Sequence, residues 1–192
     1  MQIKAVRSTP HLPGEEGLWV LILGDMMVFS LFFLTFTYYR GQEVALFAQS
    51  QKALSQYCGI INTVLLLTSS WFVANALNAA RAGAGRRAQR LFSLAGLCGL
   101  GFVVVKVIEY SGKIDAGITL TTNDFFMFYF MFTGIHLVHV LIGLAVLSYA
   151  YHRAGREVLR PGDLSALECC AIFWHLVDFL WIVLFAIFYL MK

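Results

Sequence analysis

The segment FWHLVDFLWIVLFAIFYLMK, residues Phe173–Lys192, decides the fold class of this chain. It is long and apolar enough to cross a hydrocarbon layer of about 30 Å as a helix. It also carries His175 and Asp178, three residues apart. A charge in lipid costs about 2.5–3.5 kcal/mol on insertion scales, so such groups normally face protein or water and pair. The segment therefore predicts a membrane helix whose ionisable residues have partners.

The composition extends this prediction to the whole chain of 192 residues. Hydrophobic residues make up 59% of it, and Asp, Glu, Lys and Arg only 13%, about half their usual share in a soluble domain. The four cysteines form no C-x-x-C motif, so we expect reduced thiols that fill apolar space. A net charge of +3 gives no indication of a nucleic-acid partner.

Five long apolar blocks are expected to span the membrane. They cover residues of about 18–39, 58–80, 91–110, 125–151 and 167–190. Each is longer and more uniformly apolar than the alternating segments of a membrane β-barrel. We therefore expect an all-α membrane protein, a bundle of five transmembrane helices in one domain at 18–192. The preceding tail, residues 1–17, lacks the apolar core of a cleavable signal.

The positively charged residues of the connections predict the orientation. Nine share the side of the N-terminal tail: Lys4, Arg7, Arg81, Arg86, Arg87, Arg90, Arg153, Arg156 and Arg160. Four lie on the other side: Arg40, Lys52, Lys113 and Lys192. Because such residues favour the cytoplasmic side, we expect a cytoplasmic N-terminus and a C-terminus outside, in the periplasm.

Several ionisable residues fall within the expected spans. They are Asp25, Lys106, Glu109, His136, His139, Glu168, His175 and Asp178. Helix positions three apart differ by about 60° around the axis and about 4.5 Å along it, so their side chains can meet. This spacing holds for three pairs: His136 and His139, Lys106 and Glu109, and His175 and Asp178. We expect an ion pair in the second and an imidazole–carboxylate hydrogen bond in the third.

Four uses of these residues stay open on chemical grounds. Two membrane histidines can hold a b-type haem between facing helices. A di-metal site needs Glu-x-x-His pairs, whereas this chain has one His-x-x-Asp and one His-x-x-His. A chain of acids and histidines can also relay protons. The fourth use, a structural network that fixes helix register, is the one that physics alone favours. An independent b-haem carrier or a small transporter is thus an alternative function.

Four motifs then follow one another along the chain. They are GLWVLILGDMMVFSLFF (Gly17–Phe33), KVIEY (Lys106–Tyr110), FTGIHLVHVLIG (Phe132–Gly143) and ECCAIFWHLVDFLWIVLF (Glu168–Phe185). In this order they closely resemble the cytochrome c oxidase subunit III family of haem-copper terminal oxidases. The resemblance runs from about residue 17 to the C-terminus, and its G-x-H-x-x-H-V and W-H-x-V-D-x-x-W elements are long and specific.

The resemblance implies a function that composition does not show. Family members are non-catalytic subunits beside subunit I of a respiratory complex that passes electrons from cytochrome c or quinol to oxygen. Subunits I and II hold the haem and copper. Subunit III stabilises subunit I, supports its proton uptake and binds phospholipids. The resemblance thus implies the bacterial inner membrane, partner subunits I and II, and no cofactor on this chain except structural phospholipid.

The resemblance also implies roles for individual residues, none of them catalytic and none a metal ligand. It implies buried structural or proton-side roles for Asp25, Glu109, His136, His139, Glu168, His175, Asp178 and Trp181. Lys106 joins this set only through its three-residue spacing from Glu109. Contacts with lipid phosphates are expected for Arg81, Arg86, Arg87, His136 and His152. The guanidinium group of arginine suits the geometry of a phosphate.

The chain is expected to depart from the family pattern in three places. Longer relatives have two further N-terminal helices, whereas this chain resembles the five-helix forms of bacterial oxidases. Asp25 stands where many relatives have Glu, and Lys106 stands where several have an uncharged polar residue. Subunit-III-like proteins associated with nitric-oxide reductases have a similar short N-terminus and a similar segment before the first span, here HLPGEEGLW, His11–Trp19. An accessory role beside such a reductase is therefore a second alternative.

Overall fold

The computed structural model describes residues 16–156 and 161–191. The expectations for the tail, with Lys4 and Arg7, and for Arg160 and Lys192 lie outside these residues. The described part is helical and contains no strand. Five of its helices are long and apolar enough to cross a membrane, which confirms the predicted all-α membrane fold.

The five long helices extend beyond the expected spans. They are α1 (Glu16–Gln42), α3 (Gln56–Arg81), α4 (Gly85–Asp115), α5 (Asp124–Ala154) and α6 (Pro161–Phe185), which continues as the π-helix η1 (Ala186–Leu190). The largest difference is in α4, expected at about 91–110. Hydropathy marks only the part of a helix that lies in lipid, whereas hydrogen bonding continues through the polar residues at both ends. A short helix, α2 (Val44–Gln51), occupies the first connection and was not predicted.

Local chemistry sets the ends of the central helices. The Asn123 side chain accepts a hydrogen bond from the Phe126 N–H, at 3.0 Å, and so caps the start of α5. Gly83 and Gly117 follow α3 and α4 with φ of 75° and 74°, a left-handed conformation that glycine adopts without strain. The chain turns back after each of these helices, so α4 packs against both α3 and α5.

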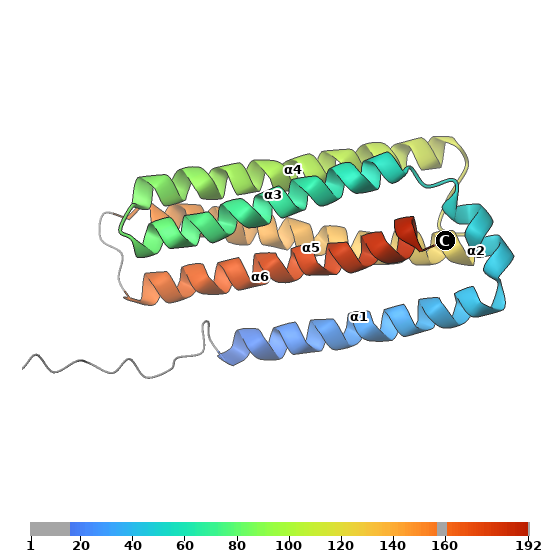
Figure 1. Ribbon diagram of the computed structural model, residues 1–192, viewed down its shortest axis with the longest axis horizontal. Helices are drawn as coiled ribbons and strands as arrows, with labels where there is room; N and C mark the ends of the chain where they lie inside the picture. Colours follow the sequence, from blue (N-terminus) through green and yellow to red (C-terminus); the bar gives the residue numbers. More distant parts are fainter. Residues whose placement is uncertain (1–15, 157–160, 192) are drawn as a thin grey trace, which may run out of the picture.

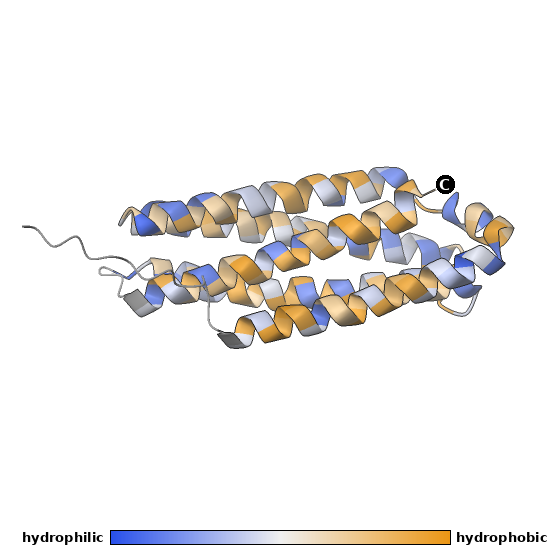
Figure 2. Ribbon diagram, turned by 60° about the horizontal axis from the view of Figure 1, so that its bottom comes forward, coloured by the Kyte–Doolittle hydropathy of each residue, from blue (hydrophilic) through white to orange (hydrophobic). Residues whose placement is uncertain are grey.

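Helices α3, α4, α5 and α6 form an elongated bundle, and α1 lies along one side of it (Figure 1). Only 11% of the most apolar stretch of α1 is buried, against 56% for the α6–η1 helix. Phenylalanine rings make the attachment, including Phe36 against Phe188 at 5.1 Å and Phe32 against Phe132 at 5.2 Å. Apolar residues cover most of α1 and give way to polar ones toward its C-terminal end (Figure 2), so most of its surface is left for lipid or another chain.

Small residues let the inner helices approach one another closely. Trp174 of α6 is fully buried. A Cβ atom on Gly143 of α5 would lie 2.7 Å from the Trp174 ring, and one on Gly99 of α4 would lie 2.9 Å from it. Packing of this kind drives helix association in membranes, where no hydrophobic force acts between helices.

Candidate functional site

A buried polar cluster surrounds Lys106 near one end of the bundle. The Lys106 Nζ atom donates to Glu109 Oε2 at 2.9 Å and to the hydroxyls of Tyr129 and Tyr189 at 3.2 Å each. The Tyr189 hydroxyl donates in turn to Glu109 Oε1 at 2.7 Å. Lys106 is completely buried and Glu109 is 6% exposed. The ion pair expected from the spacing is therefore present, and two tyrosines from α5 and η1 complete it.

Aromatic rings and a second lysine extend this lysine cluster. The Lys106 Nζ atom lies 4.9–5.7 Å from the ring centroids of Tyr110, Tyr129, Trp181 and Tyr189. At such distances the ring faces attract a cation. Lys113 lies 4.0 Å from Glu109 Oε1 and donates to the Ala53 carbonyl at 3.4 Å. The cluster thus reaches from the bundle interior to the α2–α3 connection.

A second polar contact joins α1 to α5. The His139 Nε2 atom lies 3.0 Å from Asp25 Oδ1, and its Nδ1 atom lies 2.9 Å from the Ile135 carbonyl oxygen. A carbonyl only accepts, so Nδ1 carries a hydrogen. Nε2 and Oδ1 must then share one further proton to form a hydrogen bond. The side chains of His139 and Asp25 are 20% and 17% exposed, so this proton-sharing pair is not sealed in the core.

His175 has a different main partner from the one expected. Its Nδ1 atom lies 2.6 Å from the Ser70 Oγ atom of α3 and 3.5 Å from Asp178 Oδ2. Neither oxygen of the buried Asp178 has a hydrogen-bond partner within the described residues. The spacing thus brings the imidazole and the carboxylate within 3.5 Å as expected, but the short hydrogen bond of His175 crosses to another helix.

His136 and Trp181 form a layer inside the bundle. The His136 ring is fully buried, 5.4 Å from the Trp181 ring and 5.6 Å from that of Phe102. Trp181 donates to Thr63 Oγ1 at 3.1 Å. Because the His136 ring is enclosed, the expected contact between His136 and a lipid phosphate is wrong. With His139 bonded to Asp25 as well, the arrangement does not favour a bis-histidine haem site.

The end of the bundle at the α3–α4 turn is rich in arginine. A cavity of about 740 Å³ is lined there by residues that include Arg81, Arg86, Gln89 and Arg156. Arg81 also pairs with Glu168 of α6 at 2.8 Å. Arg81 and Arg86 were expected to contact lipid phosphates. Arg156, which also lines the cavity, was not among the expected lipid contacts. Arg87 and His152 are not among the lining residues.

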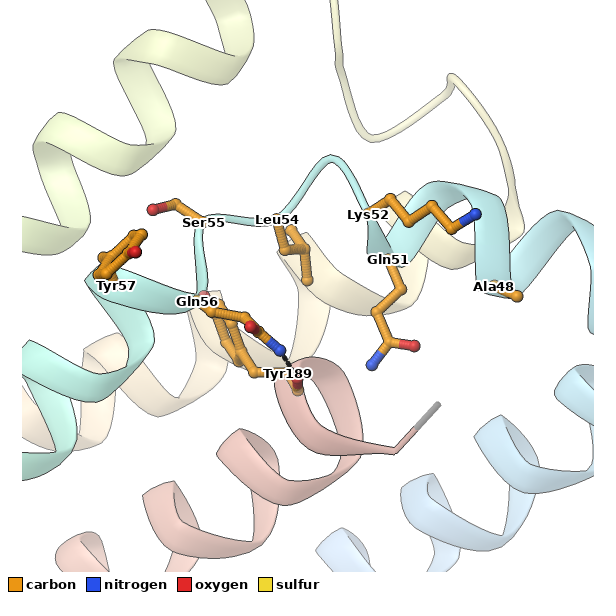
Figure 3. A pocket seen from close by; sticks show the side chains of 8 residues that line it. All are labelled: Ala48, Gln51, Lys52, Leu54, Ser55, Gln56, Tyr57 and Tyr189. Carbon is orange, nitrogen blue, oxygen red and sulfur yellow. Dashed lines mark hydrogen bonds between the residues drawn. The ribbon is translucent and has the colours of Figure 1, made fainter.

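A cavity of about 570 Å³ lies at the opposite end, between the α2–α3 connection and η1 (Figure 3). Its lining includes Gln51, Lys52, Gln56, Tyr57 and Tyr189. The Gln56 side chain points to Tyr189 and donates to its carbonyl at 3.0 Å. Gln51 donates to the Phe188 carbonyl, also at 3.0 Å. These amides hold η1, which carries Tyr189 into the lysine cluster.

Among residues 16–156 and 161–191, no group of three His, Cys, Asp or Glu side chains could hold a metal ion. The helices and polar contacts define a class: a multi-pass membrane bundle with ionisable residues paired within and between its helices. Sequence comparison gives the family within this class. The chain belongs to the cytochrome c oxidase subunit III family, whose pattern matches residues 14–192. This match confirms the resemblance seen in the four motifs.

Named relatives come from several bacterial oxidases. A Mycobacterium tuberculosis protein named "Probable cytochrome c oxidase subunit 3" is 26% identical over 176 residues, 92% of this chain and 87% of the relative. "Quinol oxidase subunit 3" of Bacillus subtilis is 27% identical over 175 residues, 91% of this chain and 85% of its own. "Cytochrome bo(3) ubiquinol oxidase subunit 3" of Buchnera aphidicola is 25% identical over 177 residues, with 91% and 84% covered.

Proposed function

We propose that this chain acts as the non-catalytic subunit III of a respiratory haem-copper terminal oxidase in a bacterial inner membrane. The family match over residues 14–192 carries the proposal. In it, residues 18–192 act as one domain that contacts mainly subunit I, with subunit II in the same complex. The N-terminus faces the cytoplasm, and haem and copper belong to the partner subunits. This chain contributes packing, lipid binding and support of proton uptake.

The pair of Asp25 and His139 is the proposed contribution to proton uptake. The two side chains share a proton across a 3.0 Å contact, and both are partly exposed. Asp25 lies about a third of the way along α1 from its N-terminal end, which the proposed orientation makes the cytoplasmic side. A group that can gain and lose a proton at this depth can pass protons toward a neighbouring subunit.

The arginine-lined cavity is the proposed lipid site. It brings Arg81, Arg86 and Arg156 to the end of the bundle that the proposed orientation places at the cytoplasmic leaflet. Guanidinium groups bind phosphate oxygens in a bidentate manner. A phospholipid headgroup therefore fits this cavity by charge and chemistry. Arg87 and His152 stay proposed contacts with other lipid phosphates.

A mild-detergent pull-down of this chain from native membranes, with co-purifying chains identified by mass spectrometry, tests the proposal. We expect a haem-copper subunit I and a copper-bearing subunit II. Recovery of nitric-oxide reductase chains instead would move the protein to that complex. Recovery of this chain alone in good yield, or a haem Soret band in it, would overturn the subunit assignment.

A further inference from the structure

His175 is unusually exposed for an ionisable residue in the middle of a membrane helix. It lies one residue from the centre of the Gly162–Leu190 span. Its side chain is 42% exposed, against 6% for Asp178, 17% for Asp25 and 20% for His139. A polar group left in hydrocarbon without a hydrogen bond is costly. The exposed edge of this imidazole therefore needs a partner outside the chain.

The inner edge of the imidazole is already occupied. Nδ1 lies 2.6 Å from Ser70 Oγ, with Asp178 Oδ2 at 3.5 Å. The Ser70 hydroxyl can donate to Nδ1 or accept from it, but the Asp178 carboxylate can only accept, so it favours the tautomer with the hydrogen on Nδ1 and a lone pair on Nε2. Nε2 makes no hydrogen bond within the described residues. In this tautomer the Nε2 atom of the half-exposed His175 side chain is an acceptor that requires a donor.

Lipid does not supply such a donor at this depth. The hydrocarbon core is about 30 Å thick, so the headgroups are about 15 Å from a residue at its centre. Acyl chains have no hydrogen-bond donors. A neighbouring transmembrane helix with a hydroxyl or an indole N–H does have one, and polar side chains commonly bond between membrane helices.

The surroundings of His175 also suit a helix. On α6, Phe179 follows one turn later and is 50% exposed, and Ile182 is 40% exposed. On α3, Leu67 precedes Ser70 by one turn and is 49% exposed. These apolar side chains surround the polar His175 on two helices, α3 and α6, that run side by side (Figure 1). Exposed side chains of α4, such as Leu97 and Leu100, are apolar and need only lipid.

We propose that the α3–α6 face around His175 is a subunit interface, where a transmembrane helix of another oxidase subunit donates a hydrogen bond to Nε2 of His175. This inference rests on the proposed function, because it takes the partner from the same complex. It adds the surface used and the chemistry of the contact: a Ser, Thr, Tyr or Trp side chain at mid-membrane depth.

Site-specific photo-crosslinking in native membranes tests the interface. Benzoylphenylalanine replaces Phe179 in one variant and Leu100 of α4, which is 52% exposed, in the matched control. We expect position 179 to give an adduct with a larger subunit of the complex and position 100 to give lipid adducts only. Lipid adducts alone at 179, a dimer of this chain, or the same protein adduct at 100 would overturn the proposal.

Variants of His175 test the hydrogen bond. We expect His175→Phe to lower the protein adduct at position 179 about three-fold, the factor that one average interhelical hydrogen bond in a membrane supplies. His175→Gln places a polar group near the Nε2 position and should restore it. Ser70→Ala removes only the inner partner and should leave most of the adduct. Equal yields from His175→Phe and His175→Gln would contradict the proposed contact.

The two proposals can fail separately. If the unmodified chain co-purifies with oxidase subunits but position 179 labels only lipid, the interface is wrong and the subunit assignment stands. If the chain purifies alone, the assignment itself is wrong.

Discussion

The imidazole of His139 and the carboxylate of Asp25 meet across the seam between α5 and α1, with 3.0 Å between Nε2 and Oδ1. The rest of this seam is largely aromatic, and the Phe29 ring lies 5.7 Å from the His139 ring. One proton-sharing contact therefore lies among apolar contacts, on the least buried of the five membrane-spanning helices that the structure describes. A change in this pair is expected to affect both α1 docking and proton exchange.

Replacement of Asp25 separates these two effects. We expect Asp25→Asn to keep a hydrogen bond to His139 and to leave assembly intact, but to slow proton uptake because an amide does not ionise. Asp25→Leu should also weaken α1 docking by about 1 kcal/mol, within the range measured for interhelical hydrogen bonds in membranes. Oxidase turnover and proton pumping across a pH series, with the melting temperature of the complex, measure both.

Met27→Leu is the matched control, since Met27 is on the same helix and 77% exposed. Wild-type turnover and pumping of Asp25→Asn at every pH would rule out a role for this pair in proton uptake.

The lysine cluster predicts an asymmetry between single and double substitutions. Lys106→Met removes the 2.9 Å cation partner of the buried Glu109 and leaves only Lys113, 4.0 Å away. Breaking a buried ion pair costs about 3–5 kcal/mol, and Lys113 should hold the loss at the lower end of that range. The double variant Lys106→Met with Glu109→Gln removes both charges and should recover much of that loss. Thermal unfolding of the purified chain in detergent measures the difference. If the double variant is no more stable than Lys106→Met alone, the loss of stability does not come from the unpaired charge of Glu109.

Two glycines of α5 provide a matched test of close packing. A Cβ atom on Gly143 would lie 2.7 Å from the buried Trp174 ring, whereas one on Gly134 would meet nothing within 4 Å. We expect Gly143→Ala to destabilise the chain by about 1–3 kcal/mol, as overpacked cores do. Gly134→Ala should be neutral or slightly stabilising, because alanine favours a helix. The melting temperatures of the two variants measure this difference. Equal values would contradict the close packing of Gly143 against Trp174.

The sequence predicted the features that depend on composition and on contacts within one helix. The five spans follow from apolar length, and the ion pair of Lys106 and Glu109 follows from three-residue spacing on α4. Both are local, so the pattern along the chain contains them. The ends of α4 were placed too far inward, because the polar residues that continue the helix carry no hydropathy signal.

Contacts between helices were not predictable in this way. His136 and His139 are three apart, yet the first packs against Phe102 inside the bundle and the second reaches Asp25 on α1. A separation of about 60° is enough to place two side chains on opposite sides of a helix seam. Likewise Ser70, rather than a residue of α6, is the main partner of His175. Such partners depend on how helices pack, which one sequence does not specify.

The orientation of the chain in the membrane is a further prediction. Among the described residues, the positive charges at one end are Arg81, Arg86, Arg87, Arg90, Arg153 and Arg156. At the other end are Arg40, Lys52 and Lys113. This excess predicts that the first end is cytoplasmic. We expect a cysteine at the exposed position 87 to be protected in intact cells, and one at the exposed position 52 to react with a membrane-impermeant maleimide.

Lys52→Cys and Arg87→Cys are to be made in a background whose four native cysteines are alanine, and inverted vesicles serve as the control. In those vesicles the reactivity of the two positions should exchange, because the cytoplasmic face then points outward. Labelling of position 87 in intact cells, with protection of position 52, would reverse the orientation. The arginine-lined cavity would then face the outer leaflet, and Asp25 would lie on the side from which protons leave.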